Sequence, residues 1–107
     1  YMLVDLWAHQ DTYTDNANRD DTTQQYRMEG TLKRLASYGD KIKVCRNYST
    51  VCALRIPPSS LDFVYVDARH DYKGALADIK AYWPLLRPGG IMAGHDYMYA
   101  HEHSKYG

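Results

Sequence analysis

The chain has 107 residues, and its thirteen Lys and Arg residues balance thirteen Asp and Glu residues, so it carries no formal net charge at neutral pH. A balanced chain sets up no long-range field that attracts DNA, RNA or anionic lipid, which argues against nucleic-acid and membrane partners. The length suits a single domain, and no apolar run reaches the roughly 18 residues that a membrane span requires. We therefore expect a small-molecule partner.

Two cysteines, Cys45 and Cys52, are spaced neither as a CxxC redox pair nor as a zinc ribbon. Unpaired cysteines are among the most buried residues of proteins. We expect both as buried thiols in a reducing compartment, and hence a cytoplasmic protein.

The first part of the chain predicts a strand, a loop and a helix. Residues 2–6 are a short, mostly apolar run typical of a buried strand, and the polar residues 8–21 follow as a loop. Apolar positions then recur at helical spacing over 23–38, with Thr22 or Thr23 as the N-cap and a glycine as the stop.

The remainder of the chain alternates strands and helices. The run of β-branched and aromatic residues before Asp67 suits a central parallel strand that is buried on both faces. In chain order the pattern predicts a strand over 41–45, a short helix capped by Ser49, a strand over 61–66, a helix from Asp71 to near Pro84, and a strand over 90–94.

This alternation predicts the fold class. Strands that alternate with helices build an α/β domain with a doubly wound, mostly parallel, Rossmann-like sheet, here of about four strands with flanking helices. The sequence opens within an apolar run that no turn or cap precedes. We therefore expect residues 1–107 to be one partial domain, in which residues 98–107 form a tail.

Polar residues follow all four predicted strands. Because the carboxyl ends of parallel strands share one edge of the sheet, where ligands bind in open α/β folds, we expect a site along that edge. Its members are Asp5, then Arg46, Asn47 and Tyr48, then Asp67 and His70, then His95 and Asp96.

Each of these residues has more than one interpretation. Asp5 can accept both hydroxyls of a ribose, or it can cap a loop. Asp67, His95 and Asp96 offer two oxygens and one nitrogen to Mg²⁺, Mn²⁺ or Fe²⁺, or they include a hydrogen-bonded pair that bridges adjacent strands. His70 is a candidate general base, or the cap of the following helix.

Two stretches then resemble a known family. Residues 61–72 read LDFVYVDARHDY, and residues 86–97 read LRPGGIMAGHDY. Together they resemble class I S-adenosylmethionine-dependent methyltransferases, and most closely the methyltransferase-24-like branch with D-x-x-H-x-Y and P-G-G-x-x-x-G-H-D-Y motifs. The resemblance covers about residues 2–97.

The resemblance implies methyl transfer from S-adenosylmethionine to a small-molecule acceptor, with Asp67, His70 and His95 near the reaction. It implies that Asp5 binds the ribose and that Asn47, Tyr48 and Ser49 border the adenine, with Asp67 beside the methionine part. It also places Asp67, His95 and Asp96 where cation-dependent relatives hold a divalent cation such as Mg²⁺, although the usual pair there is Asp-Asn rather than His-Asp.

One family feature is absent from the sequence: no glycine-rich E/D-x-G-x-G-x-G loop occurs. That loop and its strand stand at the centre of the family's sheet, so we expect open sheet edges and weak cofactor binding, unless a partner chain or a second copy completes the sheet. Two alternatives stay open: a degenerate, non-catalytic interaction domain, and a metal-dependent oxygenase or hydrolase.

Overall fold

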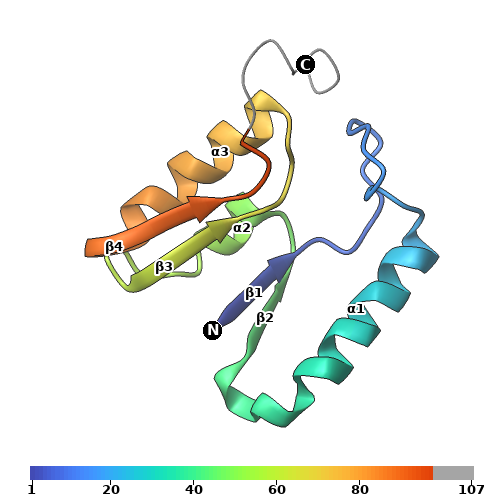
Figure 1. Ribbon diagram of the computed structural model, residues 1–107, viewed down its shortest axis with the longest axis horizontal. Coiled ribbons are helices and arrows are strands. Elements are labelled where there is room, and N and C mark those ends of the chain that lie inside the picture. Colours follow the sequence, from blue (N-terminus) through green and yellow to red (C-terminus); the bar gives the residue numbers. More distant parts are fainter. Residues whose placement is uncertain (98–107) are drawn as a thin grey trace. The chain divides into compact units, whose positions relative to one another are not determined.

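The computed structural model describes residues 1–97, and these divide into two compact units that meet in sequence between Tyr48 and Ser49 (Figure 1). Each unit combines a pair of parallel strands with helices, so the mixed α/β class and the parallel pairing are confirmed. Within residues 1–97, no helix has both the length and the apolar character to cross a membrane.

The first unit pairs β1 (Met2–Asp5) with β2 (Lys43–Arg46). The register sets Met2 opposite Lys43 and Asp5 opposite Arg46, which brings an acid and a base together at the carboxyl ends. Helix α1 (Asp21–Leu35) and a 3₁₀ turn (Ala36–Lys41) connect the two strands.

Helix α1 begins one residue after a carboxylate, and not at a threonine. Asp20 is the N-cap: its carboxylate accepts the Thr23 backbone N–H at 2.9 Å and the Thr23 hydroxyl at 2.9 Å. These bonds favour the ionised acid and lower its pKa. The prediction of Thr22 or Thr23 as the cap was wrong, because the carboxylate of Asp20 accepts both the backbone and the side-chain donor of Thr23.

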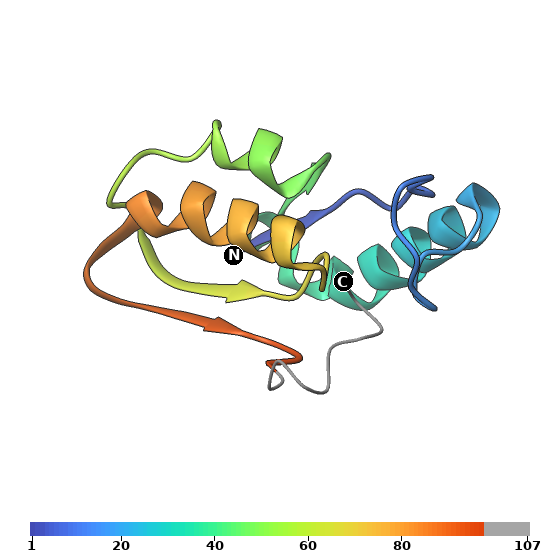
Figure 2. The same ribbon diagram turned by 90° about the horizontal axis from the view of Figure 1, so that it is seen from above.

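The second unit pairs β3 (Leu61–Val66) with β4 (Leu86–Gly94). Between them lies α3 (Tyr72–Tyr82) with a short 3₁₀ turn (Trp83–Leu85), and α2 (Ser49–Ala53) precedes β3. Figure 2 shows α3 lying along one face of the β3–β4 pair.

Strand β4 is longer than the sequence predicts, since it begins at Leu86 instead of residue 90. The Pro-Gly-Gly segment belongs to the strand and coincides with a register shift between Leu61 and Phe63. Gly89 has φ +79°, and a Cβ on Gly90 would lie 3.1 Å from the Leu61 carbonyl oxygen. Gly89 therefore adopts a left-handed backbone conformation, and Gly90 permits a close backbone approach, both of which other residues resist.

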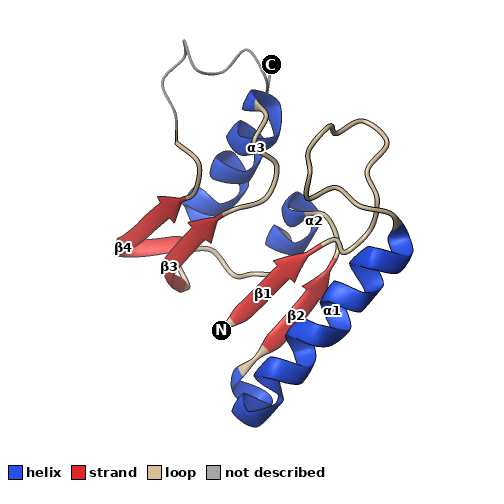
Figure 3. Ribbon diagram, turned by 45° about the vertical axis from the view of Figure 1, so that its right-hand side comes forward, coloured by secondary structure: helices blue, strands red, loops and turns tan. Residues whose placement is uncertain are grey.

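The second face of the β3–β4 pair is open in the described structure. Val64, on the α3 side, is 8% exposed, whereas Phe63 and Tyr65 are 54% and 53% exposed and Ile91, the register partner of Phe63, is 61% exposed. The prediction that β3 is buried on both faces was wrong for the described residues, because α3 covers only one face (Figure 3).

The cysteines are buried as expected, with Cys45 4% and Cys52 0% exposed. Neither is a free thiol, since both are disulfide-bonded. The interpretation as reduced thiols was therefore wrong, and the cysteines no longer support a reducing compartment. The cytoplasmic location stays a prediction.

Candidate functional site

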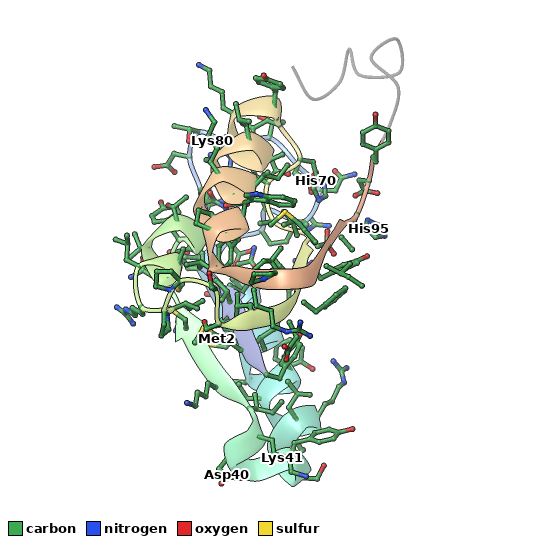
Figure 4. All side chains as sticks on the ribbon, turned by 90° about the vertical axis from the view of Figure 1, so that its left-hand side faces the viewer. Met2, Asp40, Lys41, His70, Lys80 and His95 are labelled. Atoms are coloured by element: carbon green, nitrogen blue, oxygen red, sulfur yellow. The ribbon has the colours of Figure 1, made fainter. Side chains whose placement is uncertain are left out.

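Four titratable side chains meet at the carboxyl ends of β3 and β4. Asp67 and His70 follow β3, and His95 and Asp96 follow β4. We call these four residues the His–Asp cluster. Figure 4 labels its two histidines, which lie on the same side of the unit, beside the end of β4.

The backbone of the two strands positions this cluster. The His95 N–H donates to the Val66 carbonyl at 3.0 Å, so the ladder between the strands continues one residue past β4. Asp96 then adopts φ +56°, a left-handed conformation that turns the chain at the strand end. This turn holds the imidazole of His95 and the carboxylate of Asp96 at the carboxyl ends of the two strands.

His70 lies between two carboxylates. Its Nε2 is 3.4 Å from Asp67 Oδ1 and its Nδ1 is 3.4 Å from Asp96 Oδ2, while its side chain is 23% exposed. A neutral imidazole carries one N–H, so only one of these contacts is a hydrogen bond from that form, and the second nitrogen can accept a proton.

His70 does not cap the following helix, so that alternative was wrong. Asp71 is the cap: its carboxylate accepts the Gly74 backbone N–H at 3.1 Å. The Arg69 guanidinium donates to both oxygens of the same carboxylate, at 3.1 Å and 2.6 Å, and holds the pKa of Asp71 below its usual value. The imidazole of His70 therefore takes no part in the helix cap and belongs to the His–Asp cluster.

His95 forms the shortest contact of the cluster. Its Nδ1 is 2.9 Å from Asp96 Oδ1, and this hydrogen bond, with the charges of Asp96 and then Asp67, raises the pKa of His95. The distance from His95 Nδ1 to Asp67 Oδ1 is 4.0 Å, too long for a hydrogen bond between the strands. The 2.9 Å hydrogen bond of His95 therefore joins chain neighbours and does not bridge the two strands.

Asp67, His95 and Asp96 each offer one ligand atom, and these atoms lie within 4.8 Å of one another. The donor types suit a hard or borderline divalent cation. All three residues are exposed, and exposed acidic groups are common without an ion. Coordination through His95 Nδ1 and Asp96 Oδ1 would replace the hydrogen bond between these two atoms. Metal binding stays a prediction.

In the first unit, Asp5 caps the turn that follows β1. Its Oδ1 accepts the Trp7 backbone N–H at 2.8 Å, and Trp7 has φ +43°. The side chain of Asp5 is exposed, and Oδ1 is its one hydrogen-bonded oxygen in the part of the chain that the structure describes. The loop-cap interpretation is confirmed, and ribose binding through Oδ2 stays a prediction.

Arg46 organises the same end of this unit, a function that the sequence did not indicate. Its guanidinium donates to the Trp7 carbonyl at 3.0 Å and to Gln25 Oε1 at 2.9 Å, and so ties the loop after β1 to α1. It also borders a shallow pocket together with Ala8, Asp21, Thr22 and Gln25. The feature that could have indicated this function is the position of the arginine at the end of β2, directly opposite the acid at the end of β1.

The predicted adenine segment falls at the boundary of the units. Asn47 Oδ1 accepts the Tyr48 backbone N–H at 2.8 Å, and Tyr48 is 53% exposed. Ser49 opens α2, where its hydroxyl donates to Asp78. Asp78 is a second residue that sequence analysis missed, although a carboxylate four positions before Tyr82 in the apolar stripe of a helix signals a buried polar contact.

Comparison with known proteins identifies a family. A family model described as a methyltransferase domain matches residues 1–97. No curated protein and no solved structure matches the chain.

Proposed function

Since this chain belongs to the methyltransferase-domain family, we propose that it transfers a methyl group from S-adenosylmethionine to a small-molecule acceptor. The observation that supports this donor and this class of acceptor is the His–Asp cluster. It sets a proton acceptor and two carboxylates at the carboxyl ends of parallel strands, where ligands of α/β sheets bind.

The proposed reaction is an in-line displacement. The acceptor oxygen forms a bond to the methyl carbon as the bond from that carbon to the sulfonium sulfur breaks, which leaves S-adenosylhomocysteine. The proton of an acceptor hydroxyl passes to the ring nitrogen of neutral His70 that carries no hydrogen. Because Asp67 and Asp96 face the two ring nitrogens, both carboxylates stabilise the imidazolium that forms.

The cofactor contacts of the proposal come from the family resemblance. Asp5 binds the ribose hydroxyls, Asn47, Tyr48 and Ser49 border the adenine, and Asp67 lies beside the methionine part. The hydrogen bond from the Trp7 N–H supports the first of these, because it fixes the carboxylate of Asp5 while one oxygen remains for a ligand.

Cation assistance by Asp67, His95 and Asp96 forms part of the proposal. A divalent cation there would act as a Lewis acid and make an acceptor hydroxyl easier to deprotonate. Cation binding is supported by the types of ligand atom that the three side chains offer and by the short distances between these atoms.

We also propose a fold arrangement and a partner. The two strand pairs belong to one doubly wound sheet, and a partner chain or a second copy covers its open edges. Two-stranded sheets are marginal by themselves in water, which supports the need for further strands. Light scattering of the purified chain, alone and with candidate partners, measures the oligomeric state.

Isothermal titration of S-adenosylhomocysteine into the chain, with and without Mg²⁺, tests the proposed function. We expect binding that Asp5→Ala weakens by about tenfold or more, the usual effect of losing hydrogen bonds to a charged group. Asp40→Ala, which removes an exposed acid from the 3₁₀ turn after α1, is the matched control and leaves binding unchanged.

A folded chain that binds no S-adenosylhomocysteine would contradict the proposal and favour a non-catalytic interaction domain. Metal-dependent turnover without any effect of the cofactor would instead favour an oxygenase or hydrolase. Binding that does not respond to Mg²⁺ would remove the cation from the proposal and leave the methyl transfer intact.

A further inference from the structure

Three residues of the second unit form a partly buried hydrogen-bonded group, which we call the Ser49 clamp: Ser49, Asp78 and Tyr82. The Ser49 hydroxyl donates to Asp78 Oδ1, and the Tyr82 hydroxyl donates to the Ser49 backbone carbonyl at 2.9 Å. Asp78 is 4% exposed and Tyr82 is 7% exposed. Helix α3 therefore contacts Ser49 at both its side chain and its backbone.

The clamp places a carboxylate at a buried position, where an apolar side chain would cost less free energy to bury. Asp78 is the one buried polar or charged residue among residues 1–97. Burial raises the pKa of Asp78, and the charge of Asp71 raises it further. The hydrogen bond from Ser49 and the charge of Arg69 lower this pKa, but the net shift is upward. Burial also raises the pKa of Tyr82 to about 12, so its hydroxyl stays protonated and remains a donor.

The position of Ser49 gives the clamp a consequence for ligand binding. Ser49 is the first residue of α2 and directly follows Asn47 and Tyr48. One clamp bond fixes the side chain of Ser49, and the other fixes its backbone carbonyl. Together they hold the first residue of α2 against α3.

We propose that Asp78 and Tyr82 are positioning residues, which hold Ser49 in the conformation in which it borders the adenine of the cofactor. This inference rests on the proposed function, because the cofactor contact of Ser49 belongs to that proposal. It adds two residues of α3 that touch no ligand and still set its affinity.

The test separates positioning from stability. Asp78→Leu removes the acceptor of the Ser49 hydroxyl but fills the buried site with an apolar side chain, which often preserves or raises stability. Asp78→Asn keeps an oxygen that can accept the same bond. Tyr82→Phe removes one oxygen and so frees the Ser49 carbonyl, and Lys80→Ala on the exposed side of α3 is the control (Figure 4).

The readouts are the dissociation constant of S-adenosylhomocysteine and the urea midpoint of each variant. We expect Asp78→Leu and Tyr82→Phe to bind about tenfold more weakly, with Asp78→Asn and Lys80→Ala within about twofold of the unchanged chain. A purely structural clamp predicts changes of the midpoint without this pattern in binding. If Asp78→Leu does not fold, Tyr82→Phe carries the test, since it changes a single atom.

Two outcomes contradict the inference in different ways. Unchanged affinity in the folded Asp78→Leu and Tyr82→Phe variants overturns the positioning role and leaves the proposed function standing. A folded, unmutated chain that binds no S-adenosylhomocysteine overturns the proposed function, and this inference with it.

Discussion

At the residue scale, the two histidines of the His–Asp cluster, each from its own strand end, have different surroundings. His95 forms a 2.9 Å contact with Asp96, whereas both nitrogens of His70 are 3.4 Å from carboxylate oxygens. The closer contact favours a charged ring at His95. His70 contacts a carboxylate at each ring nitrogen, and this geometry is the reason that we propose it as the base.

A first prediction concerns the protonation of His95. The pKa of His95 is raised from 6.5, first by the Asp96 hydrogen bond, so NMR titration of its ring should give a midpoint above that value. Stability from this pair is present below pH 6.5 and is lost as the pH rises through the folded-state pKa. Asp96→Asn should lower the midpoint, whereas Asp62→Asn, which removes an exposed acid paired with Arg87, should not. Equal midpoints in all three proteins would contradict this account of the cluster.

A second prediction concerns Gly74, a residue of the first turn of α3. A Cβ there would overlap the carboxylate of Asp71, which caps the helix, and the side chain of Arg69, which pairs with that carboxylate. We expect Gly74→Ala to lower the free energy of unfolding by about 1–3 kcal/mol, the usual cost of overpacking.

Gly30 provides the matched control within helix α1, because a Cβ there meets nothing within 4 Å. Gly30→Ala should raise stability by up to about 1 kcal/mol, the ordinary gain from replacing glycine in a helix. Urea unfolding measures both variants. The same sign for the two substitutions would show that the cap at Asp71 does not crowd Gly74.

At the element scale, the sequence predicted the order of strands and helices well and their boundaries less well. Apolar runs and helical spacing are local signals, and they located β1, α1, β2, α2, β3 and α3 to within a few residues. The cap of α1 was missed because Thr22 and Thr23 compete with a neighbouring acid. The start of β4 was missed because a Pro-Gly-Gly segment usually breaks a strand, and here it accompanies a register shift.

A third prediction, on Asp78, belongs to the contact between α2 and α3. Burial raises its pKa above 3.8, so the folded state disfavours its ionised form. The contribution of this group to stability is therefore greatest at low pH and falls as the pH rises from 3.8 through the folded-state pKa. Urea midpoints of Asp78→Asn, relative to the unchanged chain, should rise over that window. A constant difference between the two proteins would show that Asp78 does not titrate in a buried site.

At the scale of the whole molecule, the sequence predicted the class of the fold and the edge that carries the polar residues. The strand ends do bring Asp67, His70, His95 and Asp96 together, because parallel neighbours end at the same edge. Burial of the outer face of β3 could not be predicted, since it depends on what covers Phe63 and Tyr65 and not on the local pattern. The contact of Ser49 with Asp78 links residues 29 positions apart, beyond the reach of periodicity.

The central claim is that S-adenosylmethionine binds at the carboxyl ends of these strands, and hydrogen exchange with and without S-adenosylhomocysteine tests it most directly. The account predicts slower exchange in peptides that contain Asp5, residues 47–49 and Asp67, and unchanged exchange in the middle of α1. Uniform exchange with and without the ligand, or protection confined to α1, would contradict it.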